Sequence, residues 1–336
     1  MRFLLNISTH PGDVAIAGEH WADALSLLEQ TGFDGYEIYP VGDYDYDVIP
    51  ERIIGGIHLR FFVMIRQIWN NDRQALVDMF GSEENVRFYY GGTDRDAIID
   101  CYRRQLDLAC RFDVPYVVFH PVHYELDYVF NWQPPWNWRE TIDLSAEIIS
   151  EVVRQTSYKG WILFENLWWP GNFRLDSVRE IERLLSGVSY SRCGLVLDTG
   201  HVFNKNQSLK TEAEAISFLL DEVDRLGEYR DLVRAVHLCR SLSGDYVRVS
   251  RTIANPFAGA ATFWERFGVA ARHVRHIDRH EAFEHPSIAA LFDRIEPETV
   301  VFEFSFASRE EWLGKIERQK RALGECFSRR RPEGRR

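Results

Sequence analysis

Cysteine is scarce in this chain of 336 residues, and its pattern argues against several kinds of protein. The sequence contains five cysteines, an odd number, and no CxxC pair. They are scattered along the chain at Cys101, Cys110, Cys193, Cys239 and Cys326. A disulfide framework or a cysteine-rich zinc module would need more cysteines at closer spacing. We therefore expect a reduced, cytoplasmic protein.

Long hydrophobic runs and an excess of positive charge are also missing. No apolar stretch reaches the length of about 18 residues that spans a membrane. The opening MRFLLNISTHPGD lacks the apolar segment of a secretory signal. The formal net charge is −11, which argues against a large basic surface for nucleic acid. We expect no membrane partner, while a hydrophobic content of 45% is enough for a large core.

The order of apolar and amphipathic segments predicts an α/β fold. Eight short apolar runs lie at 3–7, 35–39, 53–58, 116–120, 161–165, 194–198, 233–238 and 299–304. Segments of helical period lie between or after them at 20–31, 96–112, 141–155, 177–186, 211–226 and 309–327. Continuous apolar strands alternating with helices are typical of a parallel sheet. A doubly wound sheet would need a glycine-rich phosphate loop, and residues 6–12 contain no GxGxxG. The eight units favour a (β/α)8 TIM barrel.

Three long segments interrupt this alternation, and the chain ends on a basic tail. The segments lie at about 64–90, 124–138 and 239–298, each after a predicted strand. In a TIM barrel such insertions belong to the loops at the C-terminal face of the strands. We predict a single barrel domain over 1–327 and a basic, disordered tail over 328–336.

Six of the predicted strands end on a side chain that can bind a metal ion. The runs GGIH, VVFH, ILFE, LVLD, RAVH and VVFE end on His58, His120, Glu165, Asp198, His237 and Glu303. Singly, each has an ordinary explanation as a hydrogen-bonded buried group. The C-terminal ends of barrel strands meet at one face, however, so all six would converge. Three carboxylates gathered there would repel one another, and divalent ions would remove that repulsion.

Two further motifs add candidate ligands. In DTGH, His201 follows the strand-end aspartate by three positions, and in DRH the residues Asp278 and His280 lie two apart. Positions two apart in an extended segment face the same side, so this pair could chelate one ion. His123 is a candidate for substrate binding. Histidine nitrogens and carboxylate oxygens suit zinc, manganese or ferrous iron.

The phrases that carry these residues resemble the xylose isomerase-like TIM barrels, also called AP endonuclease family 2, and among them most closely endonuclease IV. They are VVFHPVH, ILFENLWWPG, LVLDTGHVF, AVHL, IDRHEAFEHPSIA and VVFEFSF, in the family's order. The resemblance implies three zinc ions. It assigns His58 and His120 to one ion, Glu165 as the bridge to a second ion completed by Asp198, His237 and Glu303, and His201, Asp278 and His280 to a third.

Segments outside these motifs differ from endonuclease IV. The opening STHPGDVAIAG lacks that family's glycine-rich loop, the loop LRFFVMIRQIWN is strongly apolar, and the aromatic WQPPWNW belongs to this chain. The resemblance therefore implies the metal centre more strongly than it implies DNA as the substrate.

We favour hydrolysis of a phosphate ester, with two or three metal ions holding the phosphoryl group. Glu165 or Glu303 would orient the attacking water, and Arg279 or Arg240 would bind the phosphate. The substrate would be a small phosphate ester or a nucleic acid with an abasic site. The three residues assigned to a third ion favour this hypothesis, because isomerisation does not require a third ion.

Two alternatives remain open. A sugar isomerase or epimerase would use only Glu165, Asp198, His237 and Glu303 around one ion, with Trp168 and neighbouring tryptophans against a sugar ring. An iron-dependent redox or peptide-modifying enzyme could use the same scaffold and donor set.

Overall fold

The centre of the molecule is a closed barrel of eight parallel strands, in sequence order around the wall. The computed structural model describes residues 1–18, 20–50 and 52–328. The strands are β1 (Arg2–Ser8), β2 (Gly35–Tyr39), β3 (Ile54–His58), β4 (Tyr116–Phe119), β5 (Trp161–Glu165), β6 (Cys193–Asp198), β7 (Val233–His237) and β8 (Thr299–Phe302). The barrel closes where Phe3 of β1 pairs with Val300 of β8. The predicted (β/α)8 barrel is confirmed.

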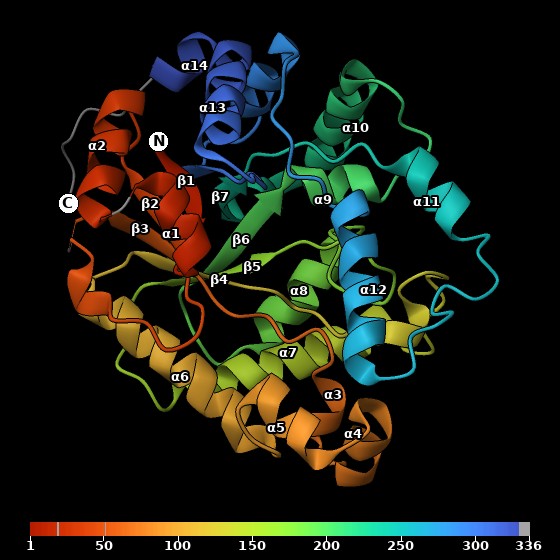
Figure 1. Cartoon of the computed structure of the whole chain (residues 1–336). Coiled ribbons are helices and arrows are strands. Elements are labelled where there is room, and N and C mark those ends of the chain that lie inside the picture. The colour runs from red at the N-terminus through yellow and green to blue at the C-terminus, as the bar shows by residue number, and fades with distance from the viewer. Residues whose placement is uncertain (19, 51, 329–336) are drawn as a thin grey trace.

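Amphipathic helices surround the barrel and cover its outer wall (Figure 1). They are α2 (Trp21–Thr31), α6 (Arg95–Arg111), α7 (Trp138–Val153), α8 (Val178–Gly187), α10 (Glu212–Arg225) and α13 (Arg309–Leu323). Their apolar stripes join the outward-facing strand residues in one large buried cluster. The connection from β2 to β3 is an exception, because it holds only the short 3-10 turn η1 (Tyr46–Val48).

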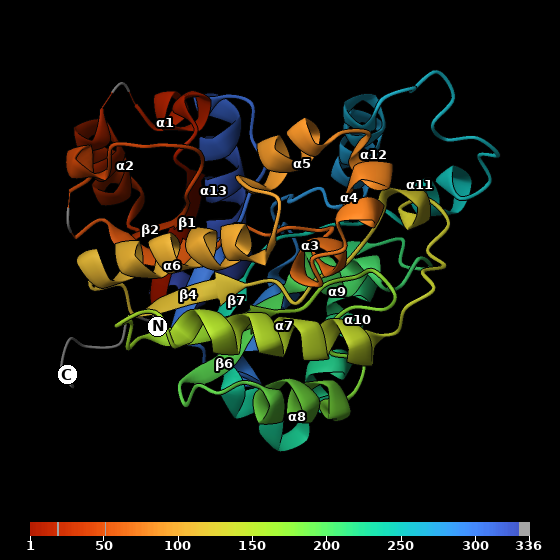
Figure 2. The same cartoon turned by 90° about the horizontal axis from the view of Figure 1, so that it is seen from below.

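The long insertions contain helices that their sequence did not predict. The first holds α3 (Arg66–Trp69), α4 (Arg73–Phe80) and α5 (Glu83–Tyr90), the second the 3-10 turn η2 (Leu126–Tyr128), and the third α11 (Gly244–Ser250), α12 (Phe263–Ile277) and the 3-10 helix η4 (Pro286–Asp293). In Figures 1 and 2, α3, α4, α11 and α12 lie at the end of the barrel opposite the labelled N-terminus. That is the C-terminal face of the strands.

The structure adds one short helix to those predicted and divides another. The added helix, α1 (Pro11–Ala17), follows β1, with Pro11 in its first turn. The helix predicted over 309–327 breaks at Gly324, so α13 is followed by a separate turn, α14 (Glu325–Ser328). The basic tail was predicted to begin at 328, and its residues 329–336 lie outside the described part of the chain. No helix within the described ranges combines the length and the apolar character of a membrane span.

Candidate metal centre

The candidate ligands at the strand ends lie two residues beyond the apolar interior of the barrel. The inward-facing interior residues are Leu4, Tyr116, Val118, Leu163, Val196, Ala235 and Val301. Because side chains alternate along a strand, the residue two positions further points the same way. Those residues include His120, Glu165, Asp198, His237 and Glu303, at or directly after the ends of five strands. The sequence alternation therefore extends the barrel interior into a polar layer at the C-terminal face.

His58, His120 and Glu165 form the first of three adjoining groups. The Nε2 atoms of the two histidines are 3.1 Å apart. Glu165 Oε2 lies 3.4 Å from His58 Nε2 and 3.0 Å from His120 Nε2. His58 Nδ1 lies 3.0 Å from the carbonyl oxygen of Leu59, and a donor at Nδ1 leaves Nε2 free to act as a ligand.

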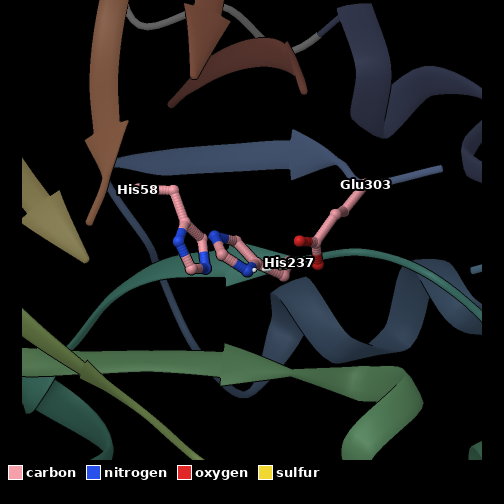
Figure 3. A group of neighbouring side chains, drawn as sticks. All are labelled: His58, His237 and Glu303. Carbon is pink, nitrogen blue, oxygen red and sulfur yellow. Dashed lines mark ion pairs between the residues drawn. The ribbon is translucent and has the colours of Figure 1, made fainter. Parts of the chain in front are cut away.

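Glu165, Asp198, His237 and Glu303 form the second group, and their ligand atoms all lie within 4.8 Å of one another. His237 Nδ1 is 3.1 Å from Glu165 Oε2 and 3.2 Å from Glu303 Oε2. Figure 3 shows His237 between His58 and Glu303, which approach from β3 and from the end of β8. Glu165 belongs to both groups, so the two share one carboxylate.

His201, Asp278 and His280 form the third group. Asp198 caps the short helix α9 (Thr199–Asn204) by accepting the His201 amide at 2.7 Å. His201 Nδ1 lies 2.7 Å from the Asn166 carbonyl oxygen, and Nε2 is directed to Asp278 Oδ2 at 3.3 Å. Asp278 Oδ2 also lies 2.7 Å from His280 Nε2.

The backbone around this third group has an uncommon conformation and is held by hydrogen bonds. Asp278 ends α12 as its C-cap, and His280 has a φ of 48°, in the left-handed region that non-glycine residues rarely occupy. Ser241 Oγ accepts the Arg279 amide at 2.9 Å and donates to Asp278 Oδ1 at 3.2 Å. A strained backbone that the surroundings hold in place is typical of functional sites.

The buried charges of the centre compensate one another through protons on the histidines. Burial opposes a positive charge on His237, but the carboxylates of Glu303, Glu37 and Glu165 raise its pKa well above the ordinary value. Burial likewise opposes the charge on His280, and Asp278 and Glu303 raise its pKa to about 10.

The carboxylates respond in opposite directions. Burial raises the pKa of Asp198 to about 8. For Glu303, burial is outweighed by His237 and His280, which hold its pKa down at about 2. In the metal-free centre, protons on these side chains therefore balance part of the negative charge of the carboxylates. A bound divalent ion would supply that positive charge instead.

The centre also contains buried atoms that a metal ion would satisfy. Glu165 Oε2, Glu303 Oε2 and both ring nitrogens of His237 have no aligned hydrogen-bond partner among the described residues. They lie close to one another, but no proton is directed between them. A buried polar atom left unpaired costs about 1–3 kcal/mol. The donor set of imidazole and carboxylate, with atoms left unpaired at its middle, fits divalent ions.

A cavity of about 460 Å³ opens onto this centre. Its wall contains ligands of all three groups, the aromatic rings of Tyr39, Phe61, Phe304 and Phe306, and the polar side chains of Asn6, Ser8, Asp13, Glu37 and Ser305. No arginine or lysine lies among the described residues that line it. The cavity has the volume of a small-molecule site.

The structure separates both predicted phosphate-binding arginines from this cavity. Arg279 is exposed, and its side chain lines a different surface cavity beside Arg275 and His276. Asp278 and His280 face the centre, so alternation turns the residue between them away from it. Arg240 donates to Glu212 at 2.8 Å and does not line the cavity.

The two other predicted substrate contacts, Trp168 and His123, lie outside the cavity. Trp168 is buried, and its ring centroid lies 4.6 Å from that of His201, so it packs against a candidate ligand. His123 is fully buried against Trp136, with Nε2 3.3 Å from Glu125 Oε1. Neither Trp168 nor His123 is among the lining residues of the cavity.

Sequence reasoning missed Glu37, which contacts the centre from β2. Its Oε1 lies 2.9 Å from His237 Nε2, and its Oε2 accepts a hydrogen bond of 2.7 Å from the Tyr116 hydroxyl. The Tyr116 ring crosses the barrel interior at Gly56, where a Cβ would lie 2.4 Å from the ring. The available signal was an acidic residue inside the apolar run GYEIY.

Cys239 also borders the centre. Its Sγ lies 3.7 Å from Asp198 Oδ1, and with His280 and Glu303 it forms one more set of neighbouring donor atoms. Burial, reinforced by the nearby carboxylates, raises the pKa of the Cys239 thiol well above its ordinary value. At neutral pH the side chain is therefore an uncharged thiol.

Comparison with known proteins places this barrel among related folds. The family model described as xylose isomerase-like TIM barrel matches residues 25–300. The structure of endonuclease IV from Thermus thermophilus aligns with a TM-score of 0.54 at 15% identity, covering 97% of this chain and 100% of that one. A D-tagatose 3-epimerase-like protein gives 0.49 at 15% identity, covering 98% of each chain. AP endonuclease, family 2 from Brucella melitensis gives 0.47 at 13% identity, covering 98% of this chain and 99% of that one. No curated protein matches the sequence.

Proposed function

The chain belongs to the xylose isomerase-like TIM barrel family, and from this premise we propose that it is a divalent-metal-dependent enzyme that hydrolyses a phosphate ester. The observation that carries the proposal is the third group, His201, Asp278 and His280, beside the shared carboxylate of the other two. A proton shuttle between two sugar carbons needs one ion, whereas clusters of two or more ions are typical of phosphatases and nucleases.

The three groups would each hold one ion. Zinc fits the donor set best, and manganese or ferrous iron would fit it as well. Divalent ions held there would polarise the phosphoryl oxygens and lower the pKa of water to near neutrality. They would also supply the positive charge that the cavity wall lacks, since no arginine or lysine of the described chain lines it.

Glu303 is the side chain best placed to accept the proton of an attacking water. It lines the cavity, and its side chain is 13% exposed against 1% for Glu165. Its Oε2 has no aligned hydrogen-bond partner within the described residues. Burial opposes its charge, but the neighbouring His237 and His280 lower its pKa to about 2, so it is ionised at neutral pH. Glu165 would position the groups around it, because it contacts His58, His120 and His237.

The test is elemental analysis combined with an assay on two kinds of ester. Protein purified without added metal should contain close to three divalent ions per chain. It should hydrolyse bis(p-nitrophenyl) phosphate and lose that activity with a chelator. A duplex with an abasic site serves as the second substrate, and the net charge of −11 predicts weak duplex binding at physiological salt. Fully metal-loaded protein that cleaves neither substrate would refute the proposal.

A sugar isomerase or epimerase is the second candidate, and the cavity wall favours it. Asn6, Ser8 and Ser305 provide amide and hydroxyl groups suited to a neutral polyol, in a cavity of about 460 Å³. Glu165 and Glu303 both lie beside Nδ1 of His237 and could move a proton between adjacent carbons. One ion per chain, together with deuterium uptake from heavy water into a ketose, would favour this function over hydrolysis.

A further inference from the structure

A second cavity, of about 1050 Å³, lies beside the first, and neither mechanism above uses it. The described residues between β2 and β3 form no α-helix, and the cavity lies between their loop and α6. One wall is the loop after β2, from Tyr39 to Tyr46, and the other is one face of α6. That face presents Cys101, Arg104, Gln105, Leu108 and Arg111, which are spaced three or four residues apart as on one side of a helix.

Two arginines that line this cavity, Arg60 and Arg104, have no carboxylate partner among the described residues. Arg60 is half-buried, and its Nη2 donates to the Tyr89 carbonyl at 2.8 Å, but it has no carboxylate partner within the described chain. Gln105 Oε1 accepts the Arg60 amide at 2.9 Å, which joins this arginine to α6. Arg104, one residue earlier on α6, makes no ion pair with any described residue.

Both guanidinium groups act on the same neighbour. Burial raises the pKa of the Cys101 thiol, and Arg60 and Arg104 oppose that rise. Arg60, Arg104 and Cys101 all line the cavity.

Three acidic residues line the cavity, of which Asp107 is paired and Asp43 and Asp45 are exposed. Asp107 binds Arg103 at 3.1 Å, and Arg111 pairs with Asp47. Asp43 and Asp45 are exposed on the loop after β2. The cationic pair Arg60 and Arg104 is therefore free to bind an anion.

Aromatic rings complete the wall. Tyr39, Tyr44, Tyr46 and Phe88 all line the cavity. Tyr44 and Tyr46 have ring centroids 5.4 Å apart, and Tyr44 is fixed by a hydrogen bond of 2.7 Å from the Trp21 indole. Phe88 is 78% exposed, which is unusual for a phenylalanine. Rings of this kind stack on planar ligands.

Tyr39 connects the two cavities, because it lines both of them. Its ring centroid lies 5.5 Å from that of His58, a member of the first ligand group. A ligand held by Arg60 and Arg104 could therefore extend past Tyr39 to the metal centre.

We propose that this second cavity binds the part of the substrate remote from the reacting bond, and that this part carries an anionic group and an aromatic ring, as a nucleotide does. The two arginines bind the anion and the tyrosines pack against the ring. The link to an ester at the metal centre rests on the proposed function, while binding in the cavity does not.

Isothermal titration calorimetry on the full chain as purified tests the ligand class, with AMP as the probe and adenosine and inorganic phosphate as its halves. AMP should bind more tightly than either half. Arg104→Ala should weaken AMP binding about tenfold or more, because it removes a charged hydrogen-bond donor. Arg95→Ala is the matched control, since Arg95 is exposed in the first turn of the same helix, α6, and does not line the cavity. Equal effects of the two substitutions, or phosphate binding as tightly as AMP, would overturn the proposal.

Thiol labelling locates the bound probe independently. AMP should slow the alkylation of Cys101 by N-ethylmaleimide and leave Cys110 unaffected, because Cys110 is on the same helix but lines another cavity. Unchanged labelling of Cys101 would also overturn the proposal. If AMP binds as expected while simple esters are not hydrolysed, the proposed function fails and this subsite stands. If esters are hydrolysed but AMP does not bind, the subsite fails and the proposed function stands.

Discussion

At the scale of single residues, protons and metal ions are two alternative sources of positive charge in the candidate centre. Five histidines and four carboxylates occupy one buried volume, and each carboxylate contacts a histidine or lies beside one. The carboxylates raise the pKa of four of these histidines, His280 among them, whereas burial lowers the pKa of His120. Single substitutions should therefore change the number or the affinity of bound ions before they change the fold.

The third ion is the most specific residue-scale prediction. The double substitution Asp278→Ala with His280→Ala should lower the metal content from three ions per chain to two, because it removes two of the three side chains in that group. Inductively coupled plasma mass spectrometry measures this number directly. His276→Ala is the control, since His276 is exposed at the end of the same helix, α12. An unchanged metal content in the double variant would contradict the three-ion assignment.

Glu37→Gln should weaken the second ion without removing any proposed ligand. Glu37 lies 2.9 Å from His237 Nε2 and holds the ring with Nδ1 toward Glu165 and Glu303. Loss of such a supporting carboxylate typically lowers metal affinity by about 10–100-fold. Competition with a chromogenic chelator measures the affinity, and Glu29→Gln, on the exposed face of α2, should leave it unchanged. If the two variants bind metal equally, Glu37 does not position His237.

At the scale of the elements, strand ends and helix ends determine where the ligands stand. Five strands lead to a ligand two residues beyond the interior core. Two others come from helix boundaries, since His201 is in the first turn of α9 and Asp278 caps the end of α12. The long insertion after β7 is thus part of the candidate centre, because α12 delivers Asp278 to it.

The N-terminus of α12 can be weakened without touching the centre. Thr262 caps this helix in a capping box with Glu265. Thr262→Ala should lower the free energy of unfolding by about 1 kcal/mol, because the Glu265 amide loses its acceptor. Urea denaturation measures the loss, and metal content should stay at the wild-type value. Thr252→Ala, at an exposed threonine that caps no helix N-terminus, should cost less than about 0.5 kcal/mol. A loss of metal in Thr262→Ala would show that the two ends of α12 are coupled.

At the scale of the whole molecule, the stability of the barrel should depend on what neutralises its polar face. The apolar interior continues directly into the buried candidate ligands, so closure of the barrel brings together charges that repel unless protons or ions lie between them. Metal binding and folding are then linked, since a ligand that binds only the folded state stabilises it.

The metal-free protein should lose stability as the pH rises from about 6.5 to about 10. His280 has an ordinary pKa of 6.5 and a folded pKa of about 10, so the folded state binds more protons than the unfolded state across that interval. Asp198, with its pKa raised to about 8, acts in the same direction below that pH. Stability must therefore decrease with pH in this window. Thermal melts of chelator-treated protein should show a falling Tm, and zinc-loaded protein a much flatter profile. Parallel profiles for the two forms would contradict the exchange of protons for metal.

The sequence by itself determined the barrel and the positions of the nine candidate ligands. Continuous apolar runs identify buried parallel strands, and a polar residue at the end of each run identifies the C-terminal face, because both signals are local and periodic. For this reason the eight predicted strands agree with β1 to β8 to within a few residues. The predicted ligands lie in adjoining groups, and metal binding by those groups stays a prediction.

Only the tertiary structure decided what surrounds those ligands. It turned Arg279 away from the cavity, paired Arg240 with Glu212, and brought Glu37 across the barrel to His237. It also left a second cavity between α6 and the loop after β2. Such features depend on the directions of side chains and on contacts between residues far apart in sequence. The periodicity of the sequence predicts neither the side-chain directions nor these contacts, because both are set by packing between elements.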